Sequence, residues 1–159
     1  MPRSLLIGFG NMDRADDGVA LYVINAVRRR LGQASLPEDD TGLDSLGDGV
    51  DTVFLSQLTP ELAEIMKDYD QILFIDAHVC EDADDLHCRP VRPEAAALTF
   101  THHISPAMML ALLQALYQRQ PAGYLVSIRG YDFDFHRNLS PHTQSLVEPA
   151  VDHILQQIR

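Results

Sequence analysis

Residues 71–77 read QILFIDA, and this stretch decides the fold. The run is almost continuously apolar, which is typical of a strand that is buried on both faces of a parallel sheet. A second short apolar run, Leu5 to Ile7, is stopped by Gly8 and predicts another buried strand near the N-terminus. Two strands of this kind indicate a sheet that is covered on both sides.

Strands and helices alternate along the rest of the sequence. Further strands are expected at residues 51–55, 87–91 and 123–128. Apolar residues at helical spacing, or a capping residue followed by proline, predict helix starts at four places: Asp16, Thr59-Pro60, Ser105-Pro106 and Ser140-Pro141. This alternation predicts an α/β fold, a single-domain three-layer sandwich with a mostly parallel central sheet and helices on both faces. We assign residues 1–159 to one domain, because the sequence shows neither an internal repeat nor a linker.

Composition narrows the classes of partner. The net charge of −11 disfavours nucleic acid, because an acidic chain repels the phosphate backbone. We expect no membrane partner, since no stretch approaches the roughly 18 apolar residues that a span needs.

The N-terminus lacks the pattern of a signal peptide, and Cys80 and Cys88 are too far apart for a CxxC motif, so we expect a cytoplasmic protein. Its acidic clusters, 38–40 and 81–85, are interpreted as loops that can meet basic surface on a partner.

The first strand is followed by a glycine-containing turn and two acids. In open α/β sheets, ligands bind beyond the carboxyl ends of the strands. Gly8 and Gly10 resemble the start of a dinucleotide fingerprint, but Asp13 stands where the third glycine is required, so we do not expect a nucleotide. Asp16 and Asp17 follow. One of them can cap the helix, and the other is then either a solvated acid or a functional one.

Three residues that are separated in the sequence are candidate metal ligands. Asp76 ends the buried strand, and His102 precedes the predicted helix start at Ser105. Together with Asp17 they would form a mixed oxygen and nitrogen site that suits nickel, zinc, iron or manganese. The alternation of the strand also puts His78 on the same side as Asp76. The plainer interpretation is that these are ordinary surface residues. The sequence lacks GxSxG and HExxH, which disfavours a serine nucleophile and a zincin-type site.

The separated motifs resemble those of the hydrogenase maturation protease family. IGFGNMDRADDGVAL at residues 7–21 is similar to that family's GxGNxxRxDDGxG signature, with Ala20 in place of the last glycine. Four further segments match in order: QLTPELA at 57–63, FIDA at 74–77, HHISPAMMLALLQALY at 102–117 and FDFHRNLSPHTQSLVEPAV at 133–151. The resemblance covers most of the chain. His78 departs from it, because the family often has a small or apolar residue there.

The resemblance implies an activity and a site. It implies an endopeptidase that removes the C-terminal extension of a nickel-loaded [NiFe]-hydrogenase large-subunit precursor, with the precursor's nickel as the recognition element and no organic cofactor. It implies that Asp17, Asp76 and His102 contact the metal, and that Asp17 or Asp76 activates water. Asp16 is then left to cap the helix or face solvent. Two alternatives stay open: a free-standing metal-dependent amide hydrolase, and a non-enzymatic metal-binding or maturation chaperone.

Overall fold

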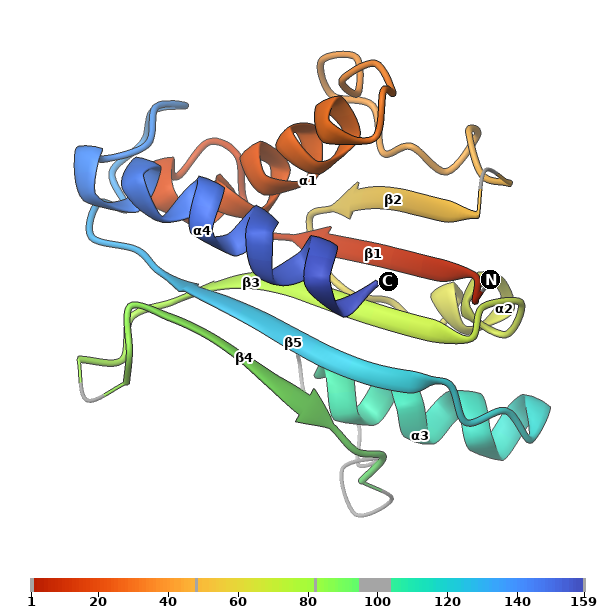
Figure 1. The fold of residues 1–159 in the computed structure, drawn as a ribbon. Helices are drawn as coiled ribbons and strands as arrows, with labels where there is room; N and C mark the ends of the chain where they lie inside the picture. Colours follow the sequence, from red (N-terminus) through yellow and green to blue (C-terminus); the bar gives the residue numbers. More distant parts are fainter. Residues whose placement is uncertain (1, 48, 82, 95–103, 159) are drawn as a thin grey trace.

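A computed structural model describes residues 2–47, 49–81, 83–94 and 104–158. Its centre is a five-stranded sheet in the order β2-β1-β3-β5-β4 (Figure 1). The strands are β1 (Ser4–Phe9), β2 (Val50–Leu55), β3 (Gln71–His78), β4 (Leu86–Val91) and β5 (Ala122–Arg129). All neighbouring strands pair in parallel except β4, which pairs with β5 in antiparallel register at one edge. The predicted sheet, mostly parallel with QILFIDA in its interior, is confirmed.

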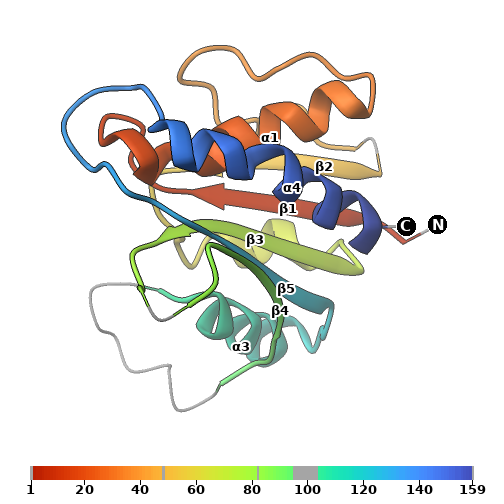
Figure 2. The same ribbon diagram turned by 60° about the vertical axis from the view of Figure 1, so that its left-hand side comes forward.

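Helices cover both faces of this sheet (Figure 2). They are a 3-10 turn η1 (Ala15–Gly18) and four α-helices, α1 (Val19–Arg30), α2 (Leu62–Met66), α3 (Pro106–Tyr117) and α4 (Pro141–Gln157). The paired helices α1 and α4 lie on one face, and α2 and α3 lie on the other. The three-layer α/β sandwich is therefore confirmed. None of the described helices is long and apolar enough to cross a membrane.

The strand β3 is apolar along almost its whole length because it lies inside the sheet and is covered on both faces. Its alternate side chains enter two different cores, because successive residues of a strand point to opposite faces. Leu73 and Ile75 pack under α1 and α4, whereas Ile72 and Phe74 pack under α2 and α3. All four side chains are fully buried.

Of the three predicted helix starts with a capping residue followed by proline, two are confirmed. The Ser105 hydroxyl accepts a hydrogen bond from the Met108 amide at 3.2 Å, and the Ser140 hydroxyl accepts one from Thr143 at 3.4 Å. At Thr59-Pro60 the expectation is wrong, because α2 begins only at Leu62. There the backbone carbonyl of Thr59 accepts from the Leu62 amide, which makes a separate turn before a very short helix.

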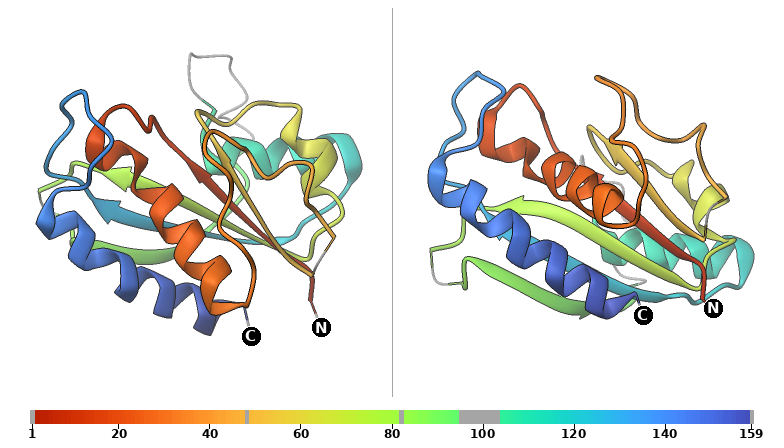
Figure 3. Two further views of the ribbon diagram at one scale, coloured as in Figure 1. Left: turned by 90° about the horizontal axis from the view of Figure 1, so that it is seen from above. Right: turned by 45° about the horizontal axis from the view of Figure 1, so that its top comes forward.

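Strand order sets the place of the site. The chain runs from β1 to β2 on one side, and then returns to β3 on the other side of β1. The carboxyl ends of β1 and β3 therefore meet at a topological switch point, where α/β sheets bind their ligands. The turn η1 follows β1 at this edge, as the views in Figure 3 show.

Candidate active site

Asp17 is held at the switch point by the glycine turn that follows β1. Its Oδ2 accepts a hydrogen bond of 2.7 Å from the backbone amide of Asn11. Gly10 has a φ of 152°, and a Cβ at this position would lie 2.0 Å from the backbone oxygen of Asp17. Only glycine fits so close an approach. The turn thus brings the backbone after β1 directly against Asp17.

Asp76 lies near the carboxyl end of β3, beside the turn η1. Its Oδ1 accepts a hydrogen bond of 2.8 Å from the adjacent Ala77 amide. Burial raises the pKa of Asp76 to about 7; the Ala77 hydrogen bond opposes this rise, and the negative charge of Asp17 adds to it. The carboxylates of Asp17 and Asp76 therefore interact across the switch point, and we call them the carboxylate pair.

The carboxylate pair has the electrostatic character of a cation site or of a general base. Among the described residues, no cationic side chain forms an ion pair with either member. Two like charges that share a partly buried place repel each other, so a metal ion would relieve the repulsion. In its absence, a carboxyl group with a pKa near 7 can accept a proton at neutral pH.

The third predicted ligand, His102, lies outside the described residues, as does His103. The described chain resumes at Ile104, and α3 is joined to β5 by a short connection. The start of α3 therefore faces the same edge of the sheet as the carboxylate pair (Figure 1). No cluster of three or more metal-binding side chains forms among the residues that the structure describes. The set of Asp17, Asp76 and His102 thus stays a prediction.

His78 is engaged by its neighbours in the sheet. Its Nδ1 lies 2.7 Å from the Oγ of Ser127, which is paired in register with Asp76 on the next strand. The ring of His87 on β4 lies 5.0 Å away. Burial, followed by the nearby His87, lowers the pKa of His78. The imidazole is therefore neutral near neutral pH and ties the ends of β3 and β5 together.

Asp16 has a different role from the one expected. The prediction that it caps the helix or faces solvent is wrong, because its exposed fraction is 0% and the residue that caps α1 is Gly18. Five hydrogen bonds of 2.7–2.9 Å reach its carboxylate from the segment between β5 and α4 and from the first turn of α4. Oδ2 accepts from the amides of Tyr131 and Asp132 and from the hydroxyls of Ser140 and Thr143, while Oδ1 accepts from the amide of Ser140.

We call this arrangement the Asp16 anchor, made by Asp16 and residues 131–143. Burial opposes ionisation, but the hydrogen bonds from Ser140, Tyr131 and Asp132 outweigh it and lower the pKa of Asp16. Sequence reasoning missed the anchor because its partners lie more than a hundred residues further along the chain. The one sequence feature that pointed to a further role was the presence of two adjacent acids, Asp16 and Asp17, at a helix start that needs only one.

Backbone contacts extend the anchor to Ala15 and to the amide of Asp16. The Ala15 amide donates to the carbonyl of His136 at 2.7 Å, and the Asp16 amide donates to that of Asp132 at 2.9 Å. Ala15 has a φ of 48°, which is uncommon for a residue other than glycine. Such strain persists only where the surroundings hold it in place. The segment before Asp17 is therefore fixed, and with it the direction of the Asp17 side chain.

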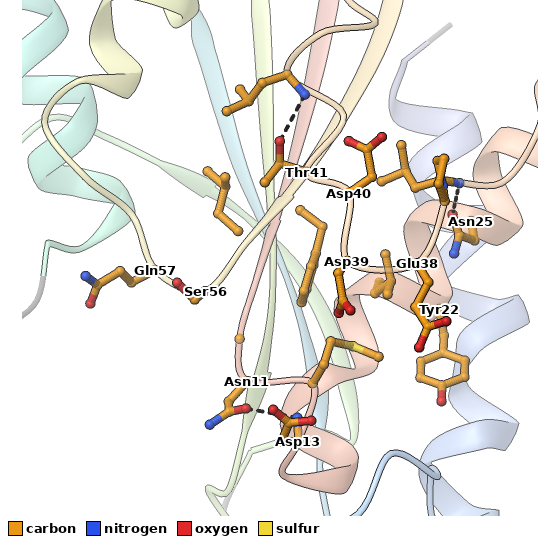
Figure 4. Close-up of a pocket in the computed structure, with 18 of the residues that line it drawn as sticks. Asn11, Asp13, Tyr22, Asn25, Glu38, Asp39, Asp40, Thr41, Ser56 and Gln57 are labelled. Carbon is orange, nitrogen blue, oxygen red and sulfur yellow. Dashed lines mark hydrogen bonds between the residues drawn. The ribbon is translucent and has the colours of Figure 1, made fainter.

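A groove of about 830 Å³ begins beside the carboxylate pair. Gly10 and Asn11 line its near end, and the Asn11 amide is the group that binds Asp17. The acidic loop 38–40 and the segment 56–57 after β2 also line it (Figure 4). Asp17 and Asp76 do not line the groove themselves, so Asn11 is the residue that links it to the carboxylate pair.

Comparisons with known proteins agree with this fold. No family model matches the sequence. The chain is 25% identical to the hydrogenase 2 maturation protease of Escherichia coli (strain K12), over 99% of this chain and 91% of that protein. Among solved structures, the hydrogenase maturating endopeptidase HybD from E. coli superposes with a TM-score of 0.71 at 21% identity, covering 99% of this chain and 92% of that one. The [NiFe] hydrogenase maturation protease HybD from Thermococcus kodakarensis gives 0.67 at 19% identity, covering 99% of both.

These similarities extend over nearly the whole length of both partners in each comparison. The chain therefore has the fold of the solved hydrogenase maturation proteases, and its sequence is similar to one such protease over nearly the whole length of both proteins.

Proposed function

We propose that this protein is an endopeptidase that removes the C-terminal extension of a [NiFe]-hydrogenase large-subunit precursor after nickel has been inserted. The observation that carries the proposal is the carboxylate pair at the switch point, which has no cationic partner among the described residues. Similarity to a hydrogenase 2 maturation protease along the whole chain supports the reaction class. We place the reaction in the cytoplasm, as the sequence predicts.

The donor set fits a metal ion that arrives with the substrate. Asp17 and Asp76 supply carboxylate oxygens, and His102 would supply an imidazole nitrogen; such a mixture suits nickel among other metals. An isolated pair of carboxylates is held in an unfavourable state by mutual repulsion and burial. A precursor that presents nickel relieves this state, whereas a precursor without nickel does not. Recognition of the metal would thus rest on the negative charge of the carboxylate pair.

Peptide hydrolysis requires a water molecule that is activated next to the scissile bond. The oxygen of this water attacks the peptide carbonyl carbon, and its proton passes to a base and then to the leaving amine. Within the carboxylate pair, Asp17 and Asp76 are both candidates for the base, because a carboxylate can accept a proton from water. Burial raises the pKa of Asp76, and a nickel ion bound to it would act in the opposite direction.

The test compares nickel-loaded and nickel-free precursors incubated with the purified protein. We expect a smaller large subunit on a gel only with the nickel-loaded precursor. The variant His102→Ala should lose this cleavage, and its neighbour His103→Ala, as the matched control, should retain it. Equal cleavage of both precursors would reject nickel recognition. Failure to cleave either one would reject the protease and favour a non-enzymatic maturation factor.

A further inference from the structure

The groove beside the carboxylate pair has an apolar lining and an acidic rim. Six of its apolar lining residues are Leu36, Leu43, Phe54, Leu55, Leu62 and Ile65. Its volume of about 830 Å³ is in the range of sites that bind sizeable ligands. Such a lining favours a ligand with apolar side chains over a wholly polar one.

The charges on the rim of the groove favour a positively charged ligand. Five carboxylates line the groove: Asp13, Glu38, Asp39, Asp40 and Glu61. Arg137 is the one cationic lining residue, and it pairs with Asp13 at 2.7 Å, Glu38 at 3.5 Å and Asp39 at 3.2 Å. Asp40 and Glu61 are exposed and have no ion-pair partner among the residues that the structure describes. These two carboxylates are available to a cationic ligand.

The β2 edge of the sheet borders the groove and presents main-chain hydrogen-bonding groups to it. β2 is the outermost strand on this side. The carbonyl of Leu55 accepts from Gly10 at 3.1 Å and therefore faces inward, so the alternation of the strand turns the Phe54 backbone outward. Ser56 follows directly after the last residue of β2. The outward Phe54 amide donates to the carbonyl of Thr41 at 2.9 Å.

Gly42, after Thr41, still lies against the Thr52 carbonyl of β2, whereas the acidic loop before Thr41 lines the groove. Figure 4 shows the loop that carries Asp39 and Asp40 on one side of the groove, with Ser56 and Gln57 on the other. Within the described chain, the Phe54 carbonyl and the Ser56 amide have no backbone partner. An open strand edge of this kind accepts an extended peptide as an added strand.

We propose that this groove binds an extended, lysine- or arginine-bearing peptide segment, which adds to the edge of β2 at Phe54 and Ser56 and places its cationic side chains at Asp40 and Glu61. Under the proposed function, on which this inference rests, the segment belongs to the precursor next to the scissile bond. Asn11 joins the groove to the reactive end, since it lines the groove and binds Asp17 at 2.7 Å. A second copy of this chain is a poor occupant, because each copy carries a net charge of −11.

The test measures peptide binding without nickel and without cleavage. Three fluorescein-labelled peptides of about ten residues alternate valine with lysine, serine or glutamate, and binding is followed by fluorescence anisotropy. We expect the lysine peptide alone to bind, and its binding to weaken as salt is raised. The double variant Asp40→Asn/Glu61→Gln should weaken it roughly three- to tenfold, since two exposed ion pairs are lost.

The matched control is Glu148→Gln/Asp152→Asn on α4, which changes the net charge equally at exposed acids away from the groove. It should leave binding unchanged. Ser56→Pro removes the main-chain donor and should weaken binding, whereas Ser56→Ala, which keeps the amide, should not. Circular dichroism reports whether each variant is folded.

Three outcomes overturn the proposal: equal binding of the serine or glutamate peptide, equal loss in the α4 control, or unchanged binding by the groove variant. Self-association that the Asp40→Asn/Glu61→Gln variant abolishes would assign the groove to a second copy and likewise overturn it. Since the assay needs no catalysis, the two ideas can fail separately. Peptide binding without precursor cleavage rejects the protease and leaves the groove in place.

Discussion

Asp16 and Asp17 are neighbours in the chain and have opposite surroundings. The Asp16 carboxylate is fully buried and accepts five hydrogen bonds, which hold the segment between β5 and α4. The Asp17 carboxylate is partly exposed and accepts a hydrogen bond from Asn11, and its negative charge contributes to the raised pKa of Asp76. One acid has its charge satisfied by the fold, while the other is left with a charge that the fold does not satisfy.

The difference teaches how a stable scaffold can carry a strained site. Hydrogen bonds lower the pKa of Asp16, so its charge stabilises the fold. Burial and a like charge raise the pKa of Asp76, so its ionised form costs stability. Groups of the second kind cluster at functional sites, because the missing partner is supplied by a substrate. The anchor holds the residues immediately before Asp17 in place.

The largest expected effect is loss of precursor processing in Asp17→Asn and Asp76→Asn. Each variant removes a carboxylate from the reactive pair, so we expect processing to slow by about 10²–10⁴-fold. Folding should persist, and Asp76→Asn should be at least as stable as the wild type at pH 8, because it removes a charge that burial disfavours. Rates from gels and free energies of unfolding from urea titration measure both effects. Asp152→Asn on α4 is the control. A variant that is inactive only because it is unfolded would move that residue from the site to the scaffold.

The next largest effect is loss of stability in Asp16→Asn. An amide presents one acceptor and one donor, but the Asp16 carboxylate is surrounded only by donors on both oxygens. Either orientation of the amide opposes at least one N–H or O–H group, so we expect a loss of about 2–3 kcal/mol in the free energy of unfolding. Urea titration of Asp16→Asn beside Asp17→Asn measures the contrast. Equal stability of the two variants would contradict the anchor.

Much of the scaffold was readable from the sequence, because local patterns determine it. The apolar run QILFIDA predicts a strand that is buried on both faces, and β3 does pack against an apolar core on each face of the sheet. The pairs Ser105-Pro106 and Ser140-Pro141 start helices through contacts within one turn. Where the signal failed, at Thr59-Pro60, the helix that follows has only five residues, and its short length leaves the first turn separate.

The role of Asp16 was not readable, because it depends on contacts between distant segments. Its partners Tyr131, Ser140 and Thr143 are 115–127 residues away, and no local pattern encodes that approach. The meeting of Asp17 and Asp76 at one edge followed from strand order, which parallel α/β topology makes predictable. The position of the groove depends on how the loop 36–41 leaves the edge of β2, a tertiary feature that composition alone does not give.

Asp16 and Asp76 should also make the free energy of unfolding depend on pH in opposite directions. Asp16 has a folded pKa below its ordinary value, so its contribution is present above that value and is lost as the pH falls through the lower folded pKa. We therefore expect the wild type to lose stability below about pH 4, where carboxyl groups ordinarily titrate, and Asp16→Asn to show a shallower loss there. Free energies of unfolding between pH 5 and pH 2 measure the slope. Parallel curves for the two proteins would show that Asp16 does not stabilise the fold through its charge.

The alkaline side tests Asp76 in the same way. Its folded pKa of about 7 lies above its ordinary value of 3.8, so the stability that it contributes is present below the ordinary value and is lost as the pH rises through about 7. We expect wild-type stability to fall over this range more than that of Asp76→Asn. The measurement is urea unfolding between pH 5 and pH 8. A wild-type curve as flat as that of the variant would mean that the Asp76 carboxyl titrates as an ordinary acid.

The smallest expected effect sharpens the comparison most directly, because it reports the contact between Asp17 and Asp76 without any activity. The charge of Asp17 is the last of the three causes that act on Asp76, after burial and the Ala77 hydrogen bond. Asp17→Asn should therefore lower the pKa of Asp76 slightly, while burial keeps it above the ordinary carboxyl value. The carboxyl carbon resonance of Asp76, followed by NMR between pH 4 and pH 9, gives the midpoint in the wild type and the variant. Asp13→Asn, which removes an acid that is paired with Arg137 in the groove, is the control and should leave the midpoint unchanged. An Asp76 midpoint that ignores Asp17→Asn, or follows Asp13→Asn equally, would mean that the raised pKa comes from burial and general charge, and the two carboxylates would then no longer count as a pair.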